Sequence, residues 1–129
     1  MQVPAFAAHH SLNPIMEEIN QDCSGGSALD QFQCVEKLQI KKDTKLKDAI
    51  ETLKSKAKSM WGRLADEEIN ARVDSSQTNW LKYREDQCEY GYYTKAKAHA
   101  PSQSLDIAVC RYKKTDERIK EIESTDPAN

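Results

Sequence analysis

One stretch of the sequence decides the fold: Gln77-Thr-Asn-Trp80-Leu81-Lys-Tyr83-Arg84-Glu85-Asp86-Gln-Cys88. Its large side chains recur at steps of three and four residues, which is the period of one face of an α-helix. The same period starts upstream at Ile69, so we expect a helix over roughly residues 66–97, with Gly91 as a candidate interruption. The stretch ends in a cysteine, and Cys110 follows downstream. These features predict a helix that is stapled by a disulfide.

A helix is also predicted before this stretch. Gly25-Gly26 breaks the chain, and Ser27-x-x-Asp30 then has the pattern of a capping box, which marks a helix start. The helix is expected to end near Gly62. Its apolar face is predicted to comprise Leu29, Phe32, Val35, Leu38, Leu46, Ala49, Ile50, Leu53, Ala57, Met60 and Leu64.

A third helix is predicted after a loop at Pro101, with Ser104 as its N-cap and Asp106 in its first turn. At the other end of the chain, Asn13-Pro14 predicts a short helical turn through Ile19. No useful length of sequence alternates as a strand would. The apolar stripe of the third helix is expected at Leu105, Ala108, Tyr112, Thr115, Ile119 and Ile122.

The composition suits one small helical domain. Of the 129 residues, 38% are apolar and 31% are charged. This lean apolar content favours narrow helical stripes over a sheet that is buried on both faces. We therefore expect an all-α fold: a small three-helix domain with long antiparallel helices over residues 13–123, followed by a flexible tail at 124–129.

The charge pattern argues against binding to nucleic acid or to a membrane. The formal net charge is -2, which gives no strong attraction to polyanions. Seven lysines lie between Lys41 and Lys58, but acidic residues interrupt them and no aromatic side chains are interleaved for base stacking. We expect a solvated helix face there. No apolar run reaches the roughly 18 residues of a transmembrane helix.

The four cysteines predict two disulfides, because no C-x-x-C pair suggests a metal site or a redox dithiol. Three pairings remain open, and the set Cys23–Cys34 with Cys88–Cys110 closes the smallest loops. Disulfides indicate export. Near the N-terminus, Val3-Pro4-Ala5-Phe6-Ala7 before Ala8 has the small-x-small pattern of a signal-peptidase site. We expect residues 1–12 to be a disordered remnant of a removed signal peptide, although an ordinary flexible terminus is the alternative.

With these elements in place, the chain resembles the LprI-like lysozyme-inhibitor family over about residues 22–122. The specific part is the segment Gln77-x-x-Trp80-Leu81-x-Tyr83-Arg84 with Cys88. The chain departs from the family at Glu85, where Asp is usual, and at Lys47 and Ile50, which replace Asn and Tyr. It therefore resembles a divergent member. Weaker matches are Asp22-Cys23, Cys34, Asp43-x-x-Leu46, Cys110 and Thr115-x-x-Arg118.

The resemblance implies an all-helical bacterial protein that is periplasmic, secreted or lipid-anchored. For some members it also implies inhibition of a cell-wall-cleaving muramidase. No cysteine precedes an apolar segment at a lipobox-like position, so the lipid anchor is not carried over to this chain. Periplasmic or secreted localisation is the expectation.

The motif residues Gln77, Trp80, Tyr83 and Arg84 allow two interpretations. Aromatic residues and arginine dominate interface hot spots, which would make them a recognition patch. The favoured interpretation is a structural cluster, with Trp80 in the core and Arg84 bonded to carbonyls or to a carboxylate at a helix end.

The next segment is the predicted contact site, because acidic side chains there adjoin tyrosines. Lysozymes are basic and have a carboxylate-lined cleft, so an inhibitor needs acidic steering at the rim and a hydrogen-bond donor inside. The alternative is that two of the tyrosines complete the core and the acidic side chains are solvated. The predicted contact residues are Glu85, Asp86, Glu89, Tyr90, Tyr92, Tyr93 and Lys95, with a tyrosine hydroxyl or Lys95 as the donor.

An enzyme is not expected, and neither is a cofactor or a metal. His9 and His10 lie in the N-terminal segment, and His99 lies in a loop without a nucleophile at a suitable spacing. The adjacent acids Asp66-Glu67-Glu68 would point in different directions on a helix.

We expect a monomer or weak dimer that acts on a protein partner. The leading hypothesis is that it binds and inhibits a lysozyme-like peptidoglycan hydrolase by occluding the cleft of that enzyme. One alternative is a periplasmic immunity protein that neutralises a secreted, cell-wall-targeting effector. Another is an envelope structural or stress protein without an enzyme target.

Overall fold

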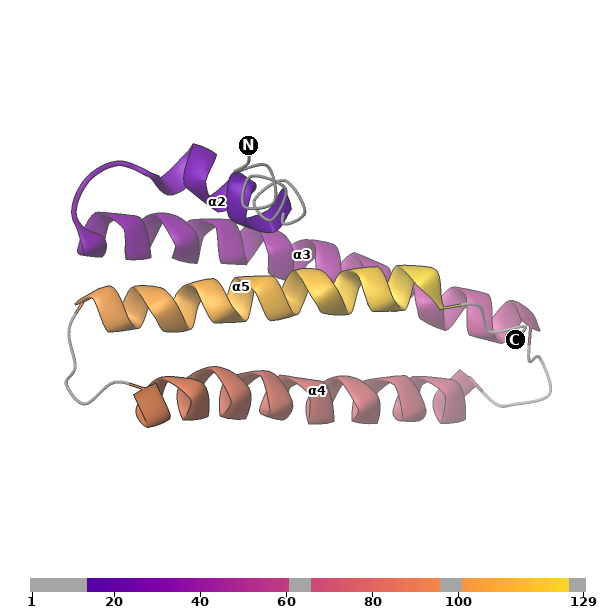
Figure 1. The fold of residues 1–129 in the computed structure, drawn as a ribbon. Helices are drawn as coiled ribbons and strands as arrows, with labels where there is room; N and C mark the ends of the chain where they lie inside the picture. The colour runs from indigo at the N-terminus through magenta and orange to yellow at the C-terminus, as the bar shows by residue number, and fades with distance from the viewer. Residues whose placement is uncertain (1–13, 61–65, 96–100, 126–129) are drawn as a thin grey trace, which may run out of the picture.

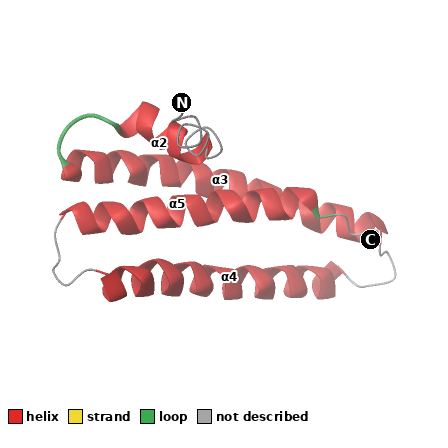
Figure 2. Ribbon diagram, viewed as in Figure 1, coloured by secondary structure: helices red, strands yellow, loops and turns green. Residues whose placement is uncertain are grey.

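The computed structural model describes residues 14–60, 66–95 and 101–125. These residues form the helices α2 (Pro14–Cys23), α3 (Ala28–Met60), α4 (Asp66–Lys95) and α5 (Pro101–Ser124) (Figure 1). No strand occurs within the described ranges, as Figure 2 shows. The predictions of an all-α fold and of three long helices are therefore confirmed.

The long helices lie side by side, and each runs antiparallel to the one before it in the chain (Figure 1). As a result α3 and α5 run in the same direction, and they make the most extensive contact among the described helices. α4 packs more sparsely on this pair. The short helix α2 lies against α3 on the side away from α4 (Figure 1). Among the described helices, none covers the remaining face of α4.

The start of α3 follows the predicted capping box. The Ser27 amide donates to Asp30 Oδ2 at 3.1 Å, and the Asp30 amide donates to Ser27 Oγ at 3.1 Å. Gly26 precedes the box with a φ of 83°. A Cβ atom at Gly26 would lie 2.7 Å from Asp30 Oδ2, so glycine is needed there for two reasons, conformation and space.

Two predicted helix limits were wrong. The N-terminal turn continues beyond Ile19 as a helix up to Cys23. α5 begins at Pro101, so Ser104 lies inside the helix and is not its N-cap. Proline fits the first helical turn because its fixed φ is helical and its missing N–H would have no intrahelical acceptor there. Asn13, Gly62, Leu64 and Lys97, where other limits were predicted, lie outside the described residues.

The apolar core forms two clusters that lie mainly between α3 and α5. The first contains Ile19, Cys23, Val35, Ala108 and Tyr112. The second contains Leu46, Ala49, Ile119 and Ile122, with Trp80 of α4 packed against it. The predicted stripe of α5 is therefore confirmed. On α3, Leu29 and Met60 are exceptions to the predicted stripe, since each is 50% exposed.

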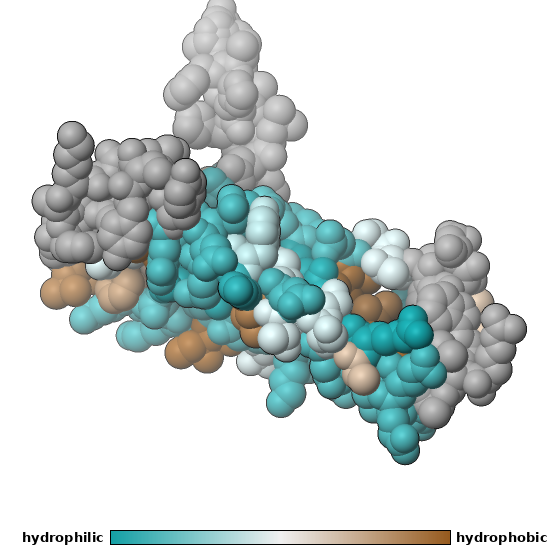
Figure 3. All heavy atoms as spheres, turned by 90° about the horizontal axis from the view of Figure 1, so that it is seen from below, coloured by the Kyte–Doolittle hydropathy of each residue, from teal (hydrophilic) through white to brown (hydrophobic). Residues whose placement is uncertain are grey.

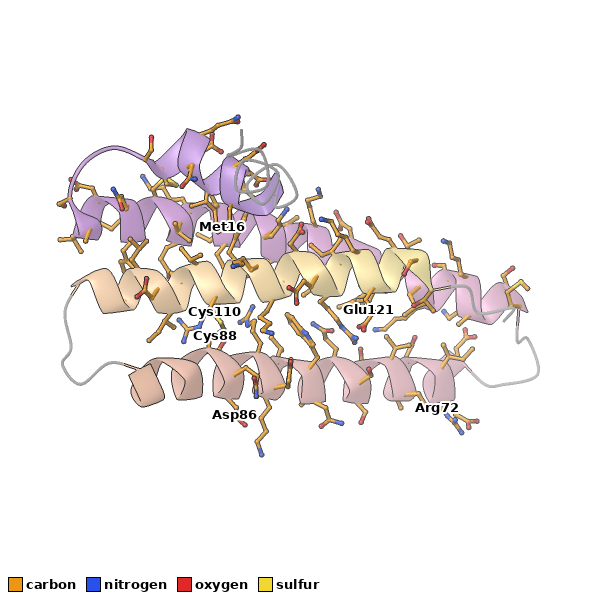
Figure 4. The ribbon with its side chains drawn as sticks, viewed as in Figure 1. Met16, Arg72, Asp86, Cys88, Cys110 and Glu121 are labelled. Carbon is orange, nitrogen blue, oxygen red and sulfur yellow. A yellow bond between two sulfur atoms is a disulfide. The ribbon has the colours of Figure 1, made fainter. Side chains whose placement is uncertain are left out.

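Both disulfides have the pairing that closes the smallest loops. Cys23–Cys34 joins α2 to α3, and Cys88–Cys110 joins α4 to α5. The Cα atoms are 5.6 Å apart in each pair, within the ordinary range for a disulfide. Figure 4 shows Cys88 and Cys110 meeting between their helices.

Candidate functional site

The motif residues of α4 and α5 meet in a stacked cluster around Trp80. The guanidinium of Arg84 lies 5.3 Å from the centre of the Trp80 ring, and that of Arg118 lies 5.8 Å from it. Arg118 also donates to Gln77 Oε1 at 3.3 Å and to Ser76 Oγ at 3.2 Å. The Arg118 contact joins α5 to α4, whereas the Arg84 contact lies within α4.

Thr115 of α5 links this cluster to α3. It is fully buried, and its hydroxyl accepts hydrogen bonds from Gln39 and Arg84, each at 3.1 Å. The same hydroxyl donates to the Arg111 carbonyl at 2.8 Å. Arg84 further lies 3.8 Å from Asp43 of α3. The side chains of Gln77, Trp80 and Arg84 thus all contact other helices, and Arg84 lies in the middle of α4 and not at a helix end. Tyr83 is 48% exposed, with Lys114 5.5 Å from its ring.

A buried ion pair lies next to Thr115. Lys42 Nζ is 3.0 Å from Asp116 Oδ1, and Lys120 Nζ is 2.8 Å from Asp116 Oδ2. Burial of the Asp116 carboxyl acts to raise its pKa, but the hydrogen bonds from Lys120 and Lys42 outweigh burial and lower it. The prediction of a solvated lysine face was wrong for Lys42, which is only 7% exposed because it reaches this partner on α5.

Helix α2 is held to the core through a polar contact. The hydroxyl of the buried Tyr112 donates a hydrogen bond to Glu18 of α2. Burial, followed by this hydrogen bond and the charge of Glu18, raises the pKa of Tyr112. This hydrogen bond ties α2 to α5 on the side of the molecule opposite α4.

The three acidic residues predicted to make contact have different surroundings. Glu85 is bound within the fold, since Arg111 Nη2 lies 2.6 Å from its carboxylate and Arg84 Nε lies 3.0 Å from it. Glu89 is half exposed and lies 3.5 Å from Arg111. Asp86 is exposed and, in the described part of the chain, forms no ion pair. Figure 4 shows Asp86 on the side of α4 that faces away from α5.

Asp86 belongs to a continuous exposed row on α4, which we call the outer row. Its members follow one another at alternating steps of four and three residues, so they share one face of the helix. No other described helix covers this face, and Figure 3, which views the molecule from the α4 side, shows a mostly hydrophilic surface with separate apolar patches. The outer row consists of Ser75, Asn79, Lys82, Asp86 and Glu89, all exposed.

Lys82 is not among the predicted contact residues. The sequence spacing places it on the same helix face as two predicted residues, because Lys82, Asp86 and Glu89 follow one another at steps of four and three residues. Beside the row, the described residues include two large exposed side chains of α4, Leu81 at 41% and Tyr83 at 48%. The outer row thus combines one cation and two acids, and Leu81 and Tyr83 point about a quarter turn to either side of it.

Several predicted residues cannot be placed on this face. The backbones of Tyr90, Tyr92, Tyr93 and Lys95 belong to α4, but their side chains lie outside the described part of the structure. His9, His10 and His99 also lie outside the described residues. The contact roles predicted for the three tyrosines and Lys95 stay predictions.

Comparison with known protein families gives a match over most of the chain. A family model described as "Lysozyme inhibitor LprI" matches residues 20–122. No curated protein and no solved structure matches the chain. The matched region contains both disulfides and all of α3 and α4. It also contains the end of α2 and all of α5 except its last two residues.

Proposed function

This chain belongs to the LprI family of lysozyme inhibitors, and we propose that it binds a lysozyme-like peptidoglycan hydrolase and inhibits it by occluding the cleft. The two disulfides and the family are consistent with an extracytoplasmic protein. Among the described helices, none is long and apolar enough to span a membrane. We propose a periplasmic or secreted location, where cell-wall hydrolases act.

The observation that carries the proposal is the uncovered outer face of α4. It extends from Ser75 to Glu89, which is about 20 Å at the helical rise of about 1.5 Å per residue. The Cys88–Cys110 disulfide and the Trp80 cluster hold α4 in one position, so little ordering is needed when a partner binds. Asp86 and Glu89 supply acidic steering toward a basic enzyme. Tyr90, Tyr92, Tyr93 and Lys95 follow Glu89 in the sequence, and their contact with the partner stays a prediction.

The direct test is the turnover of cell-wall substrate by c-type, g-type and i-type lysozymes with increasing amounts of the oxidised protein. Stoichiometric inhibition of one class supports the proposal and identifies the target class. Absence of inhibition at excess over all three classes contradicts it. The search would then turn to a dedicated effector, as expected for an immunity protein.

Charge reversal at Asp86 is the sharpest test of the acidic face. We expect Asp86→Lys to weaken inhibition roughly 3- to 10-fold, chiefly through slower association, and to reduce the salt dependence of association. Asp86 is suitable because it is exposed and unpaired in the described structure, whereas reversal at Glu85 would also break its contacts with Arg84 and Arg111. Association rates measured at two salt concentrations would show the effect.

The matched control is Glu123→Lys. Glu123 is exposed in the last turn of α5, so the substitution changes the net charge equally on a different helix. We expect it to leave the association rate nearly unchanged. An equal loss in both variants would mean that net charge alone matters and that the acidic face of α4 is not the contact.

A further inference from the structure

The outer row of α4 contains one basic side chain, Lys82. The described side chains of α4 include three basic residues: Arg72, Lys82 and Arg84. Arg72 pairs with Glu68 at 2.8 Å, and Arg84 is held by Glu85, Thr115 and the Trp80 ring. Lys82 is exposed and forms no ion pair or hydrogen bond within the described structure. Its ammonium group is free to meet a partner.

The surroundings let this lysine project from the surface. The exposed residues one turn before it, Thr78 and Asn79, are short, and the next member of the row is Asp86. A helix with its side chains is about 10–12 Å wide, too broad to enter a narrow substrate cleft as a whole. A long, flexible lysine side chain with short neighbours can enter the cleft while the helix contacts the rim. The outer face thus has a positive centre with acidic side chains on one side.

The chemistry of the proposed target matches this arrangement. Glycoside hydrolases generally cleave with a pair of carboxyl groups that flank the scissile bond. In a cleft from which water is excluded, an ammonium group hydrogen-bonded to a carboxylate makes a strong, charge-assisted contact. The same ammonium is costly to bury where no carboxylate receives it. A lysine therefore selects for clefts with ionised carboxylates.

We propose that Lys82 enters the cleft of the inhibited hydrolase and pairs with its catalytic carboxylates. This inference rests on the proposed function and adds the inhibitory side chain to it. Asp86 and Glu89 then contact the basic rim, and the exposed Leu81 and Tyr83 pack at the border of the contact. Lys82 sets specificity, because it favours a cleft that presents two carboxyl groups over one that presents none.

The first test compares inhibition constants for a lysozyme that the wild-type protein inhibits. We expect Lys82→Ala to weaken inhibition at least about 10-fold, because the carboxylates lose a desolvated partner. Lys37→Ala is the matched control. Lys37 is also exposed and free of ion pairs in the described structure, but it lies on α3, and its replacement should leave inhibition unchanged. Both variants should retain the wild-type urea midpoint.

The second test is a double-mutant cycle with a hydrolase in which one catalytic carboxyl group is changed to the amide. If Lys82 pairs with that carboxylate, Lys82→Ala should cost much less affinity against the amide variant than against the normal enzyme. Binding can be measured directly, so an inactive enzyme is no obstacle. This readout separates pairing with the carboxylate from a general loss of contact.

The outcomes separate this inference from the proposed function. If the wild-type protein inhibits no lysozyme, both fail. If the wild-type protein inhibits and Lys82→Ala inhibits equally well, the proposed function stands and the role of Lys82 is refuted. An equal loss against the normal and amide enzymes also overturns the pairing.

Discussion

Replacing Asp116 by asparagine is expected to lower the free energy of unfolding by about 3–5 kcal/mol, because the buried Lys42 loses its counter-charge. The Lys42 ammonium lies 3.0 Å from the Asp116 carboxylate, and the two side chains are only 9% and 12% exposed. An asparagine amide fits the space but carries no charge. Urea unfolding at neutral pH measures the loss.

Two comparison variants sharpen this expectation. Asp48→Asn removes an exposed carboxylate of α3 that is unpaired in the described structure, and its effect should stay within about 0.5 kcal/mol. The double variant Lys42→Met with Asp116→Leu removes both charges, and it should recover much of the stability lost in Asp116→Asn. A loss of less than about 1 kcal/mol in Asp116→Asn would mean that water compensates Lys42.

The same pair makes stability depend on pH in a defined direction. The pKa of Asp116 is lowered in the folded protein relative to its ordinary value of 3.8. The folded state therefore binds the proton less readily than the unfolded state does. The contribution of the ionised Asp116 to the free energy of unfolding is complete above roughly pH 4–5. This contribution is lost as the pH falls through the pKa of Asp116 in the folded protein. Asp116→Asn should thus lose less stability than the wild-type protein between pH 7 and pH 3.

This ion pair was not predicted from the sequence, although the sequence contains a pattern that indicates it. Leu38, Lys42 and Leu46 are spaced four residues apart, so Lys42 occupies a place in the apolar stripe of α3. Asp116 stands four residues after Tyr112 and has the corresponding place on α5. Two opposite charges within two predicted core stripes are a signal of a buried pair. The pair was overlooked because Lys42 lies among the seven lysines between Lys41 and Lys58, and composition does not distinguish one buried lysine from its exposed neighbours.

Structural features were predicted correctly where they depend only on residues close together in the sequence. The capping box at Ser27 and Asp30 is complete within four residues, and the apolar stripe of α5 requires only the helical period. The short-loop disulfide pairing was favoured but not established by loop length. The surroundings of Glu85 depend on Arg111, which lies 26 residues away on another helix. Contacts of this kind require the packing of the helices, which the pattern within one helix does not contain.

Removal of the Cys88–Cys110 disulfide is expected to cost about 3 kcal/mol and to loosen α4 before the other long helices. In the chain-entropy model, a bridge across 22 residues stabilises the folded state by about that amount. α4 depends on it because, among its described side chains, only Ile69 and Cys88 are buried apolar groups. The rest of its attachment consists of the Trp80 cluster and polar contacts such as Lys54 with Asp74, 2.8 Å apart.

The experiment is native-state amide hydrogen exchange on Cys88→Ser with Cys110→Ser, together with urea unfolding. We expect amides of α4 to exchange through a local opening that leaves α3 and α5 protected, because those two helices share most of the apolar core. Inhibition of a target hydrolase should weaken at least about 10-fold, since the outer row of α4 would have to be ordered on binding.

The Cys23–Cys34 disulfide provides the matched control. It spans only 11 residues and holds α2, which lies on the opposite side of the molecule. Its removal should cost somewhat less stability, should raise exchange in α2, and should leave α4 and inhibition nearly unchanged. If α4 stays as protected as α3 without Cys88–Cys110, the arginine and tryptophan contacts alone hold it. The outer face would then owe its rigidity to the Trp80 cluster, and Trp80→Ala would become the change that releases it.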